Sequence, residues 1–181
     1  MTALDEFGCK WNNLVVMSRN VVLFLPCKTG QTSIKAAISV NYDYATPDVI
    51  AARFMKFRRV AAFRHPVARL CSAWRDKARA RTFPHFVDWL LTLPEPRRIN
   101  PHFRPQVENW TTEDGRLIDL DDVVRTETLQ EDWARVWGGP VKHLNRGDND
   151  NHAALMRRLS PGQRSGLKQF YAADYQMMSR I

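Results

Sequence analysis

The sequence is poor in the residues that mark several specialised classes of protein. Its 181 residues hold only three cysteines, Cys9, Cys27 and Cys71. This odd number without paired spacing argues against a disulfide framework or a zinc ribbon, and such sparse use of cysteine is typical of a reducing compartment. Eight glycines and ten prolines are too few for a collagen-like or low-complexity chain. What remains is an ordinary globular protein.

Long apolar runs are absent as well. The longest clean run near the start is residues 21–25, far short of the roughly 20 residues that span a bilayer. Asp5 and Glu6 stand where a signal peptide would be apolar. We therefore expect a cytoplasmic protein without a membrane partner. Since the chain is long enough to bury a core and shows no linker or repeat, it predicts one domain over residues 1–181.

Negative charge is scarce in one segment of a basic chain. There are 27 Lys and Arg against 19 Asp and Glu, a formal net charge of +8. Residues 53–81 hold ten basic side chains and a single carboxylate, Asp76. Arg outnumbers Lys by 20 to 7, and guanidinium groups suit oxyanions such as phosphate and sulfate. A solvated basic face and a nucleic-acid-binding surface are the alternative interpretations.

Two segments have the pattern of a buried strand followed by a loop and a helix. Residues 21–25 and 60–63 are continuous apolar runs, typical of strands buried on both faces of a parallel sheet. Pro66 fits the first turn of a helix, and apolar residues recur at helical spacing after it, towards Ala80. Two such units predict an α/β fold, in which helices flank a central parallel sheet.

Weaker patterns predict the remaining elements. We expect helices after Pro84 and over residues 129–136, a third strand at residues 123–124, and loops at residues 94–105 and 146–152. The last helix has the clearest start, because Ser160, Pro161 and Gln163 form a capping-box sequence. Apolar residues recur from there to Tyr175.

The loop at residues 28–33 has the composition of an oxyanion-binding turn. Lys28 adds a mobile positive charge, and Gly30 lets the backbone approach a ligand. Thr32 and Ser33 add hydroxyl groups beside the N–H groups that open the following helix. The triphosphatase pattern G-x-x-x-x-G-K-[ST] is absent, because here the lysine precedes the glycine. By itself, this loop fits an ordinary capped turn equally well.

Taken together, the two units resemble the nucleotide-binding elements of sulfotransferases that use 3′-phosphoadenosine 5′-phosphosulfate (PAPS), above all the carbohydrate-type branch and its bacterial relatives. Residues 28–33 match the family's Lys-Thr-Gly-x-Thr-Ser loop, which holds the 5′-phosphosulfate. Residues 64–77 match its Arg-x-Pro-x-x-Arg-Leu-x-Ser-Ala-[Tyr/Trp]-x-Asp-Lys stretch almost throughout. The resemblance assigns these residues to the donor: Lys28, Thr29, Gly30, Gln31, Thr32, Ser33, Arg64 and Ser72, with Arg146 in the late polar loop as a further contact.

The resemblance also implies a reaction and a fold. The fold is a single domain of the P-loop nucleotide-kinase type, and the reaction moves a sulfuryl group from PAPS to an acceptor hydroxyl without a metal. Lys28 would neutralise the leaving oxygen. His102, in a segment similar to the family's Asn-x-His-[Trp/Phe]-x-Pro, would be the general base, with Glu127 as its rival. A carbohydrate acceptor is implied, and a small alcohol or a lipid stays open.

Two other functions remain open at this point. One is a basic nucleotide- or nucleic-acid-binding protein without catalysis, which the charge of residues 53–81 favours. The other is a magnesium-dependent kinase, against which the missing triphosphatase pattern weighs. Titration with the desulfonated donor, 3′-phosphoadenosine 5′-phosphate (PAP), would separate them. The sequence indicates no nucleic-acid partner beyond that charge, and no oligomeric state.

Overall fold

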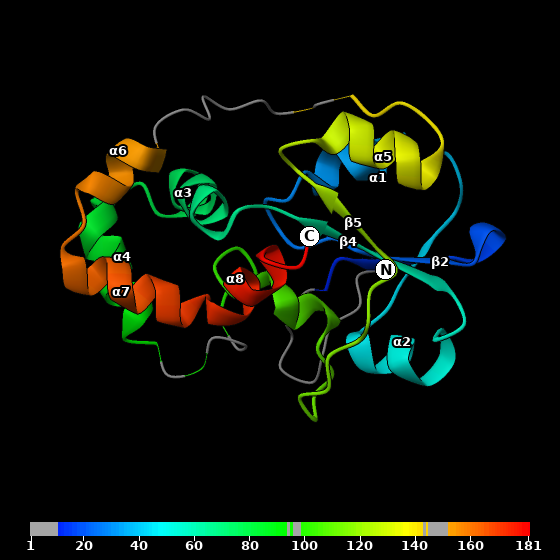
Figure 1. The fold of residues 1–181 in the computed structure, drawn as a ribbon, viewed down its shortest axis with the longest axis horizontal. Coiled ribbons are helices and arrows are strands. Elements are labelled where there is room, and N and C mark those ends of the chain that lie inside the picture. The colour runs from blue at the N-terminus through cyan, green and yellow to red at the C-terminus, as the bar shows by residue number, and fades with distance from the viewer. Residues whose placement is uncertain (1–10, 94, 96–98, 143, 145–151) are drawn as a thin grey trace.

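A mixed five-stranded sheet forms the centre of the computed structural model, which describes residues 11–93, 95, 99–142, 144 and 152–181 (Figure 1). Its strands lie in the order β3-β1-β2-β4-β5. β2 is parallel to β4, and β4 is parallel to β5, whereas β1 is antiparallel to both β2 and β3. The strands are β1 Asn13–Val16, β2 Val21–Phe24, β3 Asp43–Tyr44, β4 Arg58–Phe63 and β5 Asp122–Arg125.

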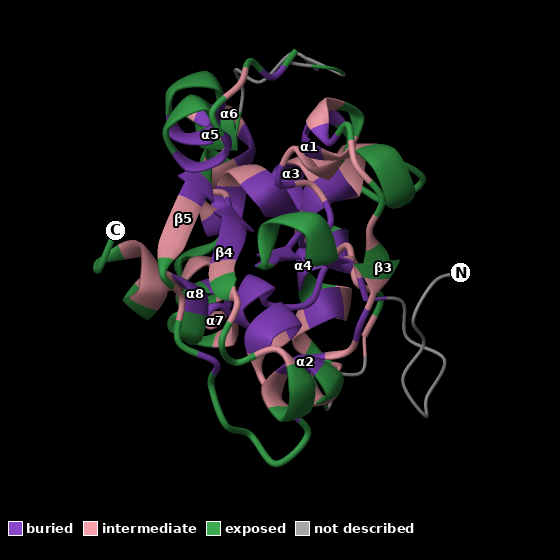
Figure 2. Ribbon diagram, turned by 90° about the vertical axis from the view of Figure 1, so that its right-hand side faces the viewer, coloured by how far each residue is buried: buried purple, intermediate pink, exposed green. Residues whose placement is uncertain are grey.

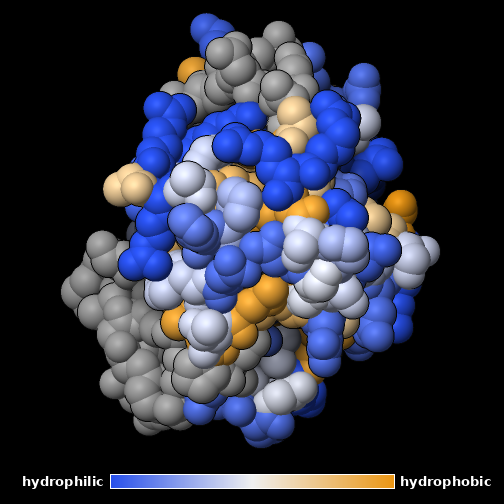
Figure 3. All heavy atoms as spheres, turned by 90° about the vertical axis from the view of Figure 1, so that its left-hand side faces the viewer, coloured by the Kyte–Doolittle hydropathy of each residue, from blue (hydrophilic) through white to orange (hydrophobic). Residues whose placement is uncertain are grey.

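Helices cover the sheet and form a lobe beside it. The described helices are α1 Gln31–Ala37, α2 Pro47–Arg53, α3 Pro66–Lys77, α4 Phe83–Leu91, α5 Leu129–Trp137, α6 His152–Arg157, α7 Pro161–Phe170 and α8 Ala172–Met178, with the short 3-10 helices η1 Met17–Arg19 and η3 Gln106–Trp110. The lobe consists of α3, α4, α6 and α7 (Figure 1). Its outer face is largely hydrophilic, with small hydrophobic areas between polar side chains (Figure 3). Among the described helices, none has the length and apolar character needed to cross a bilayer.

The alternation of side chains along β1 and β2 explains how both faces of the sheet are buried. Successive side chains of a strand point to opposite faces. Leu14 and Leu23 pack in the core that includes residues of α1 and α5, while Val15 and Val22 pack in the core that includes residues of α2 and η3. Figure 2 shows the resulting concentration of buried residues in β4 and in the helix faces turned towards the sheet.

Most predicted elements are confirmed. The expected strands at residues 21–25, 60–63 and 123–124 are β2, β4 and β5, and the helices expected from Pro66, after Pro84 and over 129–136 are α3, α4 and α5. The capping box that opens α7 is present, because Ser160 and Gln163 each accept a hydrogen bond from the other's backbone N–H.

Four expectations need correction. The sheet is not wholly parallel, since the short turn through η1, with Asn20 at φ 50°, returns the chain from β1 directly to β2, and such a tight connection gives antiparallel strands. Three elements, β1, β3 and α2, were not among those predicted. The last helix divides at Tyr171, which is buried and donates its hydroxyl hydrogen to the Phe103 carbonyl. Of the loop expected at 146–152, His152 instead begins α6, and the other residues lie outside the described part.

Candidate functional site

The loops after β2 and β4 lie side by side, as expected for adjacent parallel strands. Phe24 pairs with Ala61 in the ladder, so both strands end at the same edge of the sheet. The loop after β2 carries Lys28, and Arg64 directly follows β4. Arg64 Nη1 donates a hydrogen bond to the Lys28 carbonyl at 3.3 Å. The two predicted nucleotide-binding segments therefore meet.

The loop from Pro26 to Gly30 has a sharply turned backbone. Lys28 and Gly30 have φ values of 70° and 81°, in the region that favours glycine. Thr29 is buried and donates its hydroxyl hydrogen to the Pro26 carbonyl at 2.7 Å. A Cβ on Gly30 would lie 3.3 Å from Leu129 Cδ2. The Thr29 hydroxyl and the close approach of Leu129, from α5, to Gly30 therefore stabilise this conformation of the loop.

Three other predicted donor contacts occupy different environments. Ser33 is buried, and its Oγ accepts the Leu144 N–H at 2.9 Å. This hydrogen bond connects α1 to Leu144. Gln31 places its amide nitrogen 3.8 Å from Cys27 Sγ. Thr32 is exposed, and Arg146 lies outside the described residues. Of the three hydroxyl-bearing residues in this loop, Thr32 is therefore the exposed one.

Helix α3 presents a polar stripe to this loop. Residues three and four apart share a helix face, which puts Arg69, Ser72 and Asp76 on one side of α3. Arg69 Nε donates to the Cys27 carbonyl at 2.8 Å, and Asp76 Oδ2 lies 3.1 Å from Lys28 Nζ. Ser72 stands between these two contacts along the helix. The stripe therefore contacts the loop at two consecutive residues, Cys27 and Lys28.

The segment ahead of η3 brings His102 to the same place. Burial, together with the charges of Lys77, Lys28 and Arg69, lowers the pKa of His102 to about 4, and the charge of Asp76 opposes this shift. His102 Nδ1 lies 2.8 Å from Asn100 Oδ1, which also accepts the His102 backbone N–H at 3.0 Å. Because a carbonyl oxygen only accepts, Nδ1 carries the hydrogen and Nε2 keeps its lone pair.

Arg64 is fixed by contacts that the sequence did not reveal. The Gln106 side chain accepts the Arg64 N–H at 2.9 Å and donates to the Arg64 carbonyl at 2.8 Å. Burial lowers the pKa of Arg64, and the charge of Glu127 opposes that shift. Glu127 Oε1 accepts the His65 N–H at 3.0 Å, at the start of α3. Glu127, the alternative candidate for the general base, therefore lies near Arg64, and its carboxylate already accepts a hydrogen bond.

The basic segment 53–81 does not form one exposed face. Arg58 and Arg59 pair with Asp122 and Asp121, and Arg69 is completely buried. Pairing and burial remove three of its charges from the surface that a nucleic acid would contact. Across the described residues, no group of three His, Cys, Asp or Glu side chains could hold a metal ion.

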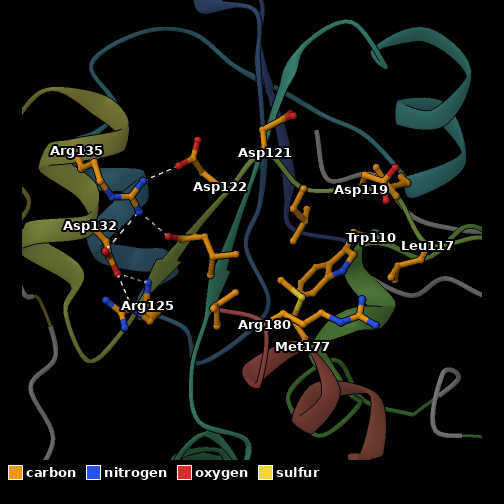
Figure 4. A pocket seen from close by; sticks show the side chains of 14 residues that line it. Trp110, Leu117, Asp119, Asp121, Asp122, Arg125, Asp132, Arg135, Met177 and Arg180 are labelled. Atoms are coloured by element: carbon orange, nitrogen blue, oxygen red, sulfur yellow. Dashed lines mark hydrogen bonds and ion pairs between the residues drawn. The ribbon is translucent and has the colours of Figure 1, made fainter.

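A separate hollow of about 700 Å³ lies along the edge strand β5 (Figure 4). Its described lining includes no residue of the segments 25–33, 64–77 or 100–106. Arg135 pairs with Asp122 and Asp132, and Arg125 also pairs with Asp132. The described lining sets four carboxylates, Asp119, Asp121, Asp122 and Asp132, against the three guanidinium groups of Arg125, Arg135 and Arg180. The hollow is therefore poorly suited to a polyanionic nucleotide, and the site at the strand ends is the better candidate.

One comparison with known proteins gives a match. The model of the sulfotransferase family matches residues 26–178, from the loop after β2 to the last residue of α8. No curated protein and no solved structure gives a significant match. The family match covers most of the chain and contains every described residue of the candidate site.

Proposed function

The chain belongs to the sulfotransferase family, and from this premise we propose that it transfers a sulfuryl group from PAPS to an acceptor hydroxyl, on a carbohydrate. The observation that carries the proposal is the meeting of three segments at one sheet edge. Lys28, Arg64 and His102 come from three different loops. Arg64 donates a hydrogen bond to the Lys28 carbonyl, and the charge of Lys28 acts on His102.

The donor would lie across the loop after β2 and the start of α3. Lys28 and Arg64 are partly buried cations there, and charge-assisted hydrogen bonds to oxyanions are stronger than neutral ones. We assign Lys28, Gly30 and Thr32 to the 5′-phosphosulfate and Arg64 and Ser72 to the 3′-phosphate. Thr29 and Ser33, whose hydroxyls bond within the protein, would contribute their backbone N–H groups.

Lys28 would act on the bond that breaks. The acceptor oxygen forms a bond to sulfur while the bond from sulfur to the bridging phosphate oxygen breaks, so negative charge grows on that oxygen. Lys28 Nζ is placed to stabilise this charge, as fixed positive groups do in phosphoryl transfer. Its present partner, Asp76 at 3.1 Å, would have to yield the ammonium group to the phosphosulfate.

His102 would receive the acceptor proton. Asn100 holds the Nδ1 hydrogen, which leaves Nε2 as the basic atom, and a positioned base of this kind contributes to transfer from a weakly acidic alcohol. Three exposed cations come after Asp76 in the sequence, Lys77, Arg79 and Arg81. They support a carbohydrate acceptor that carries negative charge, and an acceptor panel of neutral sugars, acidic sugars and simple alcohols tests this.

Binding of PAP without magnesium tests the proposed function directly. Calorimetric titration in the presence of a chelator should show saturable binding of PAP and much weaker binding of ATP. Radiolabelled PAPS should then label an acceptor. Magnesium-dependent binding of ATP in place of PAP would favour a kinase, and binding of nucleic acid that weakens steeply with salt would favour the non-catalytic alternative.

Replacing Arg64 by Ala should weaken donor binding more than it slows the chemical step. A charge-assisted contact to phosphate is worth roughly 1.5–3 kcal/mol, or about 10- to 150-fold in affinity. Ser72→Ala should act in the same direction more mildly, because it removes a neutral donor. Calorimetry with PAP and with adenosine 5′-phosphate measures the effect. If Arg64→Ala still distinguishes these two nucleotides as well as the wild type does, the assignment is wrong.

A further inference from the structure

A single buried guanidinium group joins the two loops that carry Lys28 and His102. Arg69, on α3, is completely buried. Its Nε donates to the Cys27 carbonyl at 2.8 Å, Nη1 to the Arg104 carbonyl at 2.8 Å, and Nη2 to the Pro101 carbonyl at 3.0 Å. All three nitrogens are therefore used, and each bond ends on a main-chain oxygen.

These carbonyls flank the two reacting side chains. Cys27 precedes Lys28 directly, while Pro101 and Arg104 lie on either side of His102. On the far side of the segment, Asp174 accepts the N–H groups of the first two residues of η3 at 3.0 and 3.1 Å. The segment is thus held at one end by Asp174 and along its middle by Arg69.

We propose that Arg69 is a positioning residue, whose guanidinium fork sets the distance between the loop of Lys28 and the loop of His102. The proposal rests on the function proposed above. Only a guanidinium group can make these contacts, because its three nitrogens project in fixed directions within one plane. Lysine donates all of its hydrogens from one nitrogen, so it cannot reproduce three bonds that start from three separate nitrogens. Arg69 itself contacts backbone, so its effect on the reaction passes through the two loops.

The conservative variant Arg69→Lys separates positioning from charge. It keeps a cation in the buried site but loses the fork, so the loops shift relative to each other. A misplacement of reacting groups by about 1 Å can cost on the order of 10²-fold in rate, and we expect kcat to fall by about 10- to 100-fold. The preference for PAP over adenosine 5′-phosphate should change by less than about threefold, since it depends on Arg64 and Ser72.

A matched core variant shows whether loss of stability alone explains the result. Val87→Ala shortens a fully buried side chain of α4 in the same helical lobe and removes no hydrogen bond to either loop. Both variants should have lower melting temperatures, and only Arg69→Lys should lose kcat. If the two lose the same fraction of kcat for the same loss of melting temperature, Arg69 is merely structural.

Chemical rescue supplies a second readout. Arg69→Ala leaves space for a free guanidinium ion, and about 20 mM guanidinium, far below denaturing concentrations, should raise its kcat severalfold. The same salt should not raise the kcat of Val87→Ala. Absence of rescue together with near-normal kcat in Arg69→Lys would overturn the positioning role. Failure of the wild type to bind PAP or transfer sulfate would instead overturn the proposed function.

Discussion

Replacing Lys28 by Ala is expected to lower the rate of sulfuryl transfer by about 10²- to 10³-fold, the cost of removing one electrostatic contact to a developing charge. Lys28 sits in a loop whose turn, at φ 70°, is fixed by Thr29 and by two arginines of the next unit. Its ammonium group is therefore presented from a rigid support. Single-turnover measurement with PAPS isolates the chemical step from donor binding.

Lys168 provides a control for this prediction. It is an exposed lysine of α7 and lies outside the three segments of the candidate site. Lys168→Ala should change the single-turnover rate by no more than about threefold. A more acidic acceptor should leave Lys28→Ala slow, because the defect is on the leaving oxygen. Wild-type rates in Lys28→Ala would remove Lys28 from the chemistry.

The parts of the fold that the sequence predicted are those determined by local patterns. β2 and the last four residues of β4 are continuous apolar runs, and Pro66 and the Ser160–Gln163 capping box mark helix starts in their own residues. β3 has only two residues, and its place depends on pairing with β1, which no local pattern reveals. For α2 a signal was present, since Thr46 accepts the Val49 N–H and Pro47 follows it.

The same distinction applies to the site. Lys28 and Arg64 lie in two short motifs, each directly after its own strand, and the parallel pairing of these two strands places both motifs at one edge of the sheet. Arg69 was part of the second motif, but its role depends on carbonyls 32 to 42 positions away in the sequence. Gln106 likewise reaches Arg64 across 42 positions. Buried polar groups find such partners to satisfy hydrogen bonds, and only the folded chain identifies them.

Replacing His102 by Ala should lower kcat by about 10²- to 10⁴-fold with a weakly acidic alcohol, the usual contribution of a positioned general base. An acceptor of lower pKa needs less help from a base and should partly rescue this variant, unlike Lys28→Ala. His85→Ala, which removes an exposed histidine from α4, is the control and should leave kcat unchanged.

The pH dependence gives this prediction its sharpest form. Burial and the charges of Lys77, Lys28 and Arg69 lower the pKa of His102 to about 4, against the opposing charge of Asp76. His102 is therefore neutral and able to accept a proton above about pH 4, and kcat/KM, which reports the free enzyme, should fall only below that value. A bound polyanion beside Lys28 adds negative charge near His102 and raises its pKa. The acid limb of kcat, which reports the complex, should therefore lie at higher pH than the limb of kcat/KM. Both limbs should vanish in His102→Ala. If His102→Ala keeps near-normal activity with a poorly acidic alcohol, His102 is structural, and Glu127 becomes the next candidate for the base.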